Sequence, residues 1–285
     1  MKRLPLVLVA VLGAGCAGRA TPPATPAPAP AAAPAPRPET TTLRYAVGTG
    51  RYRLESQSHV EQEVMGQTTK VDVGTVMLLS VAVADASGNL GIGITIDSLA
   101  MTLPPGMPAP DPAELTAARG KTVRLVTSTQ GQTISVVPPD SASATVKQVT
   151  QGFREFLPSL PAGPVAAGTS WSDTTTQTTP TQIGTATVHM TRQHRVLGWE
   201  DHGGTRALHL TTTGTYTLTG SGQAQGQAID LAGGGQRTTD AFVSGAGVYL
   251  GGTFSDSSLV NASIASAGMV VPVRSTTHST LTRLP

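Results

Sequence analysis

Apolar and polar residues alternate along much of the chain after residue 50. In residues 51–61, Tyr52 and every second residue after it are apolar or serine, and the intervening positions are mostly charged. A period of two is typical of a half-buried β-strand. The alternation continues over residues 71–85 and 90–97, and the Ala-Ser-Gly-Asn sequence between them favours a tight turn. These two runs predict a β-hairpin.

The same pattern recurs through the rest of the chain. Runs at residues 122–127 and 133–137 predict a second hairpin around Gln130-Gly131. Further strands are expected at residues 185–197, 205–219, 226–231, 238–250, 259–265 and 269–284, with glycine turns at 202–204 and 231–235. The expected fold class is mainly β: an antiparallel curved sheet that forms an open half-barrel or a sandwich. Residues 40–157 and 165–285 repeat the strand pattern and are two related halves in one interpretation, although they do not align convincingly.

One segment has helical periodicity instead. Asp140 or Ser141 can cap its first turn, and Pro158 ends it. Its apolar stripe consists of Val146, Val149, Phe153, Phe156 and Leu157. We expect one amphipathic helix near residues 141–157, which buries both phenylalanines against the open face of the sheet.

The N-terminal segment has the features of a secretory signal peptide. A positively charged start is followed by an apolar run at residues 4–12 and by small residues at 13–15. Cys16, the only cysteine of the chain, comes next. This arrangement resembles the lipobox of bacterial lipoproteins, although Gly13 stands where an aliphatic residue is usual. The resemblance implies removal of residues 1–15, lipidation of Cys16 with diacylglycerol and palmitate, and a membrane anchor in the cell envelope.

Two alternatives to lipidation follow from the same residues. An ordinary signal peptide would be cut near residues 17–20, and an uncleaved anchor would need an apolar run of about 20 residues, far longer than this one. A lone cysteine in an exported chain has no disulfide partner, which favours lipidation. By resemblance to Gram-negative lipoproteins, Ala17 in place of aspartate implies sorting to the periplasmic face of the outer membrane.

Residues 21–38 are almost entirely alanine, proline and threonine. Proline lacks an amide donor and has a fixed φ, so this stretch can join neither a helix nor a sheet. It is typical of a semi-rigid polyproline spacer with a reach of roughly 60 Å. We therefore expect residues 16–39 to be a lipidated N-terminus and linker, and residues 40–285 to be a β-rich domain.

Charge and composition exclude one class of partner. Removal of residues 1–15 leaves 17 of the 19 basic residues against 17 acidic ones, and aromatic residues make up 4% of the chain. A nucleic-acid-binding domain is expected to carry a basic patch interleaved with aromatics. We expect no nucleic-acid partner.

A second resemblance lies after the predicted helix. Residues 157–171 contain a proline-rich stretch, Pro164-Val165, and then Gly168 and Ser170-Trp171 at the start of a strand. This stretch is similar to a family of uncharacterised bacterial lipoproteins whose β domains have no known function. It implies an envelope lipoprotein and little chemistry. In structural terms it is a crossover between the two halves, with Trp171 packed in the core.

No set of residues with catalytic or metal-binding spacing is present. His189 and His194 differ by five positions and therefore face opposite sides of a strand, and His202 and His209 complete no zinc motif, so solvated histidines are expected. Ser244 lacks the glycines of a nucleophile elbow. A site of paired carboxylates would need aspartates that converge in space, and the spacing of the four candidates does not predict such convergence. They are Asp97, Asp173, Asp201 and Asp240. We expect no catalytic residue, no metal and no cofactor.

Two functions remain open. A non-enzymatic binding module would hold an apolar or amphipathic ligand in the curved sheet, with the helix as a lid and weak candidate contacts at Phe153, Phe156, Trp171 and Trp199. The alternative is a structural or protein-interaction lipoprotein of the envelope without a small-molecule ligand. The half-barrels of lipoprotein carriers are similar to the first in outline, but a shared fold is a poor guide to function.

Overall fold

The computed structural model describes residues 42–64, 66–105, 112–139, 146, 150, 152–180, 184–224 and 227–285. The predicted signal peptide, Cys16 and the proline-rich linker lie outside the described residues, as does most of the predicted helix. No helix among the described residues is long and apolar enough to cross a membrane.

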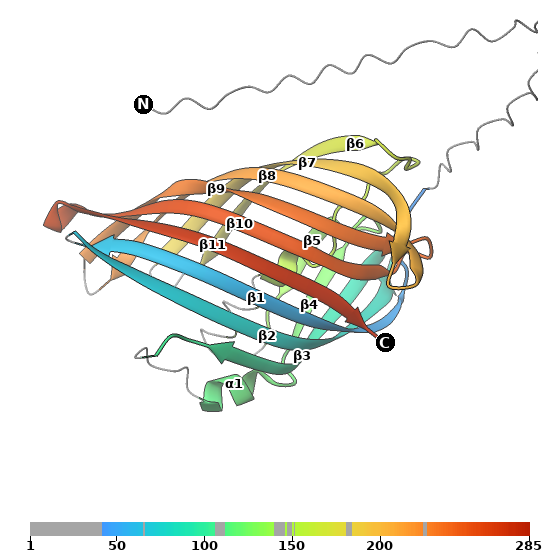
Figure 1. Cartoon of the computed structure of the whole chain (residues 1–285), viewed down its shortest axis with the longest axis horizontal. Coiled ribbons are helices and arrows are strands. Elements are labelled where there is room, and N and C mark those ends of the chain that lie inside the picture. Colours follow the sequence, from blue (N-terminus) through green and yellow to red (C-terminus); the bar gives the residue numbers. More distant parts are fainter. Residues whose placement is uncertain are drawn as a thin grey trace, which may run out of the picture. The chain divides into compact units, whose positions relative to one another are not determined.

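One antiparallel sheet of eleven strands contains most of the described chain (Figure 1). The strands lie in the order β5-β4-β3-β2-β1-β11-β10-β9-β8-β7-β6. Their bounds are β1 Gly48–Val64, β2 Gln67–Ala86, β3 Asn89–Thr102, β4 Thr122–Thr127, β5 Thr133–Val137, β6 Ser170–Pro180, β7 Gly184–His202, β8 Thr205–Ala224, β9 Gln227–Ser244, β10 Tyr249–Ile264 and β11 Met269–Leu284. The described helices are α1 Pro112–Ala118 and the short 3-10 turns η1 Gly152–Glu155 and η2 Ala265–Ala267.

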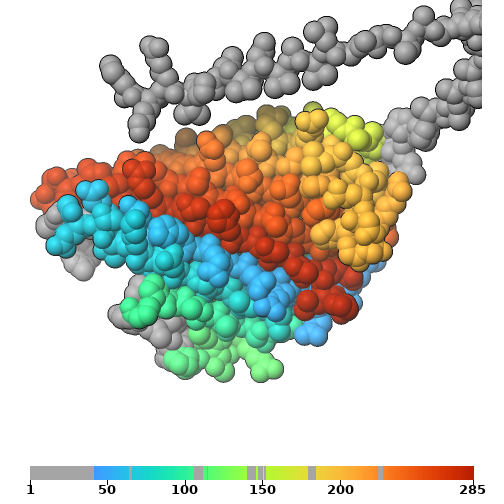
Figure 2. All heavy atoms as spheres, in the orientation of Figure 1, coloured from blue at the N-terminus to red at the C-terminus, as the bar shows by residue number. Residues whose placement is uncertain are grey.

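The first and last strands along the chain, β1 and β11, lie side by side in the interior of the sheet. β1 pairs with β11 along twelve register positions from Arg51 to Gln62, so that in Figure 2 the blue N-terminal strands lie directly beside the red C-terminal strand. The chain runs outward from β1 to the edge strand β5 and returns inward from the other edge, β6. Within the described part of the chain the two edges do not pair. The prediction of a mainly β fold with an open half-barrel is confirmed.

Residues 138–169, which we call the crossing segment, connect one edge strand to the other. Its prolines lack the amide donor that a strand ladder needs, and among its described residues Val165 alone forms a β-bridge. Its apolar side chains Phe153, Phe156, Leu157, Leu160 and Val165 are buried in the core. The crossover predicted for this stretch is confirmed.

The core lies on one face of the sheet, which we call the inner face, and toward one end of the strands. Leu79, Ile94 and Val243 are fully buried there. Along β1 the inward residues change from Tyr52, 5% exposed, to half-buried positions farther along the strand. Register shifts in β2–β3, β4–β5, β7–β8 and β9–β10 mark bulges, which bend and twist a sheet. The inner face is therefore buried at one end of the strands and more exposed to solvent at the other.

One detail of the sequence prediction is wrong, and one element was not predicted. The sequence analysis named no helix at α1, although Pro112 at a first helical position and the good helix formers after it suit a short helix. The turn expected at residues 231–235 lies within β9, and the chain turns instead at residues 245–248. Glycine is tolerated inside β9 because neighbouring backbone approaches closely: a Cβ at Gly235 would clash with the Ser257 carbonyl oxygen of β10.

The predicted helix is described only in part. Val146 and Thr150 are helical and buried, and residues 152–155 form the 3-10 turn η1. Phe156 lies just beyond this turn, and its amide donates to the Phe153 carbonyl. Both phenylalanines are buried against the inner face, as the apolar stripe predicted.

Candidate functional site

Five inner-face residues on five neighbouring strands lie directly opposite one another. The register pairs Asp256 with Arg237, Arg237 with Gly214, Gly214 with Arg192, and Arg192 with Asp173. We call this set the arginine row. It is symmetric, with an aspartate outside each arginine and a glycine between the two arginines. Because paired strands lie about 4.8 Å apart, the two arginine backbones are separated by roughly 10 Å.

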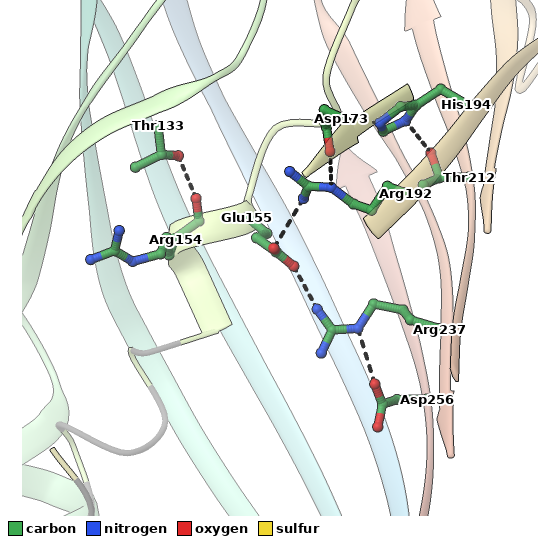
Figure 3. A network of polar contacts seen from close by, with 9 residues as sticks. All are labelled: Thr133, Arg154, Glu155, Asp173, Arg192, His194, Thr212, Arg237 and Asp256. Carbon is green, nitrogen blue, oxygen red and sulfur yellow. Dashed lines mark hydrogen bonds and ion pairs between the residues drawn. The ribbon is translucent and has the colours of Figure 1, made fainter. Parts of the chain in front are cut away.

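Each arginine is held by its own aspartate (Figure 3). Arg192 Nε donates to Asp173 Oδ1 at 2.7 Å, and Arg237 Nε donates to Asp256 Oδ2 at 3.1 Å. The Tyr216 hydroxyl donates to the other oxygen of Asp256 at 3.0 Å. These bonds fix the guanidinium planes and leave the remaining N–H groups free to point toward the gap above Gly214.

Glu155 from the crossing segment fills that gap. Its Oε1 accepts from Arg192 Nη1 at 3.0 Å and its Oε2 accepts from Arg237 Nη1 at 2.5 Å, as Figure 3 shows. Gly214 leaves the space open, since a Cβ there would already lie 3.3 Å from the Arg192 Cγ. One carboxylate thus bridges two arginines with charge-assisted hydrogen bonds, the strongest class that side chains make.

The acidic side chains of the cluster keep Arg237 ionised. Burial by itself lowers the pKa of Arg237, but the charges of Glu155 and Asp256 outweigh this and raise it above its ordinary value. Arg237 therefore stays charged. With two arginines against Glu155, Asp173 and Asp256, the cluster carries one net negative charge.

A cavity of about 330 Å³ lies between the crossing segment and the inner face, at the arginine row. Its volume is at the lower end of the range of about 300–1,000 Å³ for small-molecule sites. The polar side chains of its lining, which we call the polar wall, are Arg192, Arg237, Glu155 and Asp256 together with serines and threonines. The apolar side chains, which we call the apolar wall, come in part from the same strands and are Leu54, Leu79, Phe153, Phe156, Leu157, Met190, Phe254 and Leu281. The cavity is therefore amphipathic.

The residues named from the sequence as candidate ligand contacts lie in three places. Phe153 and Phe156 line the cavity. Trp171 lies behind it, stacked on His194 with ring centroids 4.9 Å apart. Trp199 packs against the core farther along β7, and Arg206 lies over its ring, 6.0 Å from the centroid. The structure thus places two of the four candidates at the cavity.

The expectation of solvated histidines is wrong for His194, which is only 4% exposed. Its Nδ1 lies 2.8 Å from the Thr212 hydroxyl and its Nε2 lies 3.2 Å from Asp173. Burial lowers the pKa of His194, and the charge of Asp173 only partly opposes this. His189, five residues earlier, is exposed on the opposite face, as the spacing predicted.

The other groups considered from the sequence have separate partners. Asp97 accepts from the Ser80 hydroxyl, Asp201 from the Gly204 amide, and Asp240 contacts His209 on the outer face. Of the four aspartates considered from the sequence, only Asp173 belongs to the arginine row. Among the described residues, no three histidine, cysteine or acidic side chains are placed to hold a metal ion.

Sequence reasoning missed Arg192, Arg237, Glu155 and Asp256. They come from three strands and the crossing segment, 37 and 82 residues separate Glu155 from the two arginines, and no local motif links them. The one available signal was the alternation of the strands. It places Arg192 and Arg237, although they are charged, on the inward-facing side of their strands.

No known protein family matches the sequence, and no curated protein matches it. Among solved structures, two matches are crystal structures of Pseudomonas aeruginosa OccK2 (OpdF), one of them in complex with glucuronate. Their sequences are 9% and 10% identical to this one, and each has a TM-score of 0.26. Each match covers 83% of this chain and 98% of the OccK2 chain. A TM-score this low supports no conclusion about this chain.

Proposed function

We propose that this protein is an envelope lipoprotein whose β domain binds an apolar or amphipathic ligand in the cavity beneath the crossing segment. The observation that carries the proposal is the cavity itself, whose lining combines an apolar wall with a pair of arginines held in place by aspartates. Pockets that combine apolar lining with a few fixed polar groups are the usual form of small-molecule sites.

Binding is the role that the polar groups support. Glu155, Asp173 and Asp256 each contact an arginine of the row. These contacts hold the guanidinium groups in fixed positions, which suits the recognition of a polar or charged ligand group.

The proposed location follows from the N-terminal segment. Lipidation at Cys16 would anchor the domain to the periplasmic face of the outer membrane, and the proline-rich linker would hold it off the bilayer. A ligand with an apolar part would suit a protein anchored at that surface.

Native mass spectrometry of the purified full chain tests the binding proposal. We expect a co-purifying small molecule or lipid in the wild type, and its loss in Ser279→Trp, which places an indole in the cavity wall. Thr280→Trp is the matched control, because the next residue of β11 is exposed on the opposite face. A ligand-free wild type that also fails to take up an added amphiphile would contradict the proposal and favour the alternative, a protein-interaction lipoprotein.

A further inference from the structure

The arginine row forms a carboxylate-binding site, and the protein's own Glu155 occupies it. The two aspartates satisfy the Nε atoms of the arginines, whereas both Nη1 atoms converge on a single carboxylate. Of the acids in this cluster, Glu155 alone comes from outside the sheet. The strands thus build the site, and the crossing segment supplies its occupant.

Glu155 can leave this site without movement of the backbone that carries it. Its side chain is 36% exposed, so rotation brings the carboxylate to water. The neighbouring backbone stays anchored, because Phe153 and Phe156 are buried and the Thr133 hydroxyl donates to the Arg154 carbonyl at 2.5 Å. Displacement of Glu155 therefore opens the cavity's polar wall while the apolar wall remains in place.

Charge selects the kind of group that replaces Glu155. Without it, two arginines face two aspartates, and the row is neutral with two unused guanidinium donors. A single carboxylate restores the observed arrangement, whereas a dianion would add an uncompensated charge in a partly buried site. Arginine also matches the planar carboxylate geometry better than other cations do.

We infer that the ligand is an amphipathic monoanion, a long-chain carboxylate, whose acid group takes the place of Glu155 between Arg192 and Arg237. The inference rests on the proposed function and specifies its ligand class. The alkyl chain lies along Leu54, Phe254 and Leu281, the lining residues on the core side of the row. Glu155 competes with the ligand for the arginines, so it lowers the apparent affinity and makes binding selective for acids able to displace it.

Calorimetric titration of the full chain with monomeric dodecanoate and with dodecanol tests this inference. In Glu155→Gln, we expect dodecanoate to bind on the order of tenfold more tightly, because the internal competitor is gone. In Arg237→Gln and Arg192→Gln, dodecanoate affinity falls on the order of tenfold or more. Dodecanol affinity stays unchanged in all three variants, since an alcohol does not need the arginines.

Matched controls come from the outer face of the same sheet. Glu63→Gln and Arg195→Gln remove exposed charges from β1 and β7 and should leave both affinities unchanged. Circular dichroism checks that each variant is folded, and Arg192→Lys serves in place of Arg192→Gln if that variant does not fold, with an intermediate loss expected.

Two results would overturn the inference, and they differ in whether the proposed binding function fails with it. If the acid and the alcohol bind equally and Glu155→Gln changes neither, the carboxylate class is wrong, while the cavity remains a ligand site. If neither compound binds to any variant, the proposed function itself fails and the inference fails with it.

Discussion

Truncation of Phe156 tests whether the crossing segment is part of the cooperative core. The Phe156 side chain is 6% exposed, and its ring makes edge contacts with Tyr52 and Tyr249 at centroid distances of 5.4 Å and 5.7 Å. Burying such a side chain contributes about 1.5–3 kcal/mol by transfer alone. A closed void of roughly 100 Å³ would add about 2.4 kcal/mol at ~24 cal/mol per Å³.

The void left by Phe156→Ala is not closed, because Phe156 lines the existing cavity. Water can enter it, which reduces the void contribution, so we expect a loss of about 3 kcal/mol in the free energy of unfolding. Urea unfolding followed by circular dichroism measures this loss. Phe156→Leu should cost roughly 1 kcal/mol, and Val270→Ala, at a position 58% exposed, should cost less than about 0.5 kcal/mol. A loss below about 1 kcal/mol in Phe156→Ala with an unchanged m-value would refute the reasoning, since the segment would then unfold separately from the sheet.

Three further predictions concern the sheet, pH and the N-terminus. Gly235→Ala should lower the free energy of unfolding in urea by about 1–3 kcal/mol, because its Cβ would meet the Tyr216 ring at 2.7 Å. In the control Gly163→Ala the new Cβ meets nothing within 4 Å, so the substitution should be neutral or slightly stabilising. Equal effects of the two substitutions would contradict the argument. Because burial lowers the pKa of His194, the unfolded chain binds its proton more readily, so the free energy of unfolding should fall as pH decreases below the ordinary value of 6.5. A wild type and His194→Gln with the same pH dependence would show that this histidine contributes nothing. Cys16→Ala should release the protein from membranes, and a mature wild-type N-terminus that is unmodified and begins after Ala17 would rule out lipidation.

Strand positions were predictable because alternation is a local signal. The bounds predicted for β4, β5 and β11 match those of the structure, since each run ends at clear turn chemistry. The failure at Gly233–Gly235 has an equally local cause. Three glycines favour a turn unless neighbouring strands pack so closely that only glycine fits, and that packing depends on β8 and β10.

The core contribution of the crossing segment was predictable in part. The spacing of Phe153 and Phe156 showed that they must be buried, but the sequence contains no information about which strands receive them. The contacts of Phe156 with Tyr52 and Tyr249 join residues about a hundred positions apart. The buried state of His194 was missed for the same reason, because its partners Asp173 and Thr212 are supplied by neighbouring strands.

The sequence by itself determined the β class and the strand faces, both of which depend on residues close together in the chain. Only the tertiary structure decided the register between β6, β7, β8, β9 and β10, and with it the alignment of the arginine row. A shift of one residue in any of these pairings would move an arginine or an aspartate of the row to the outer face. The site exists because cross-strand pairing and the crossing segment bring together charges that the chain keeps far apart.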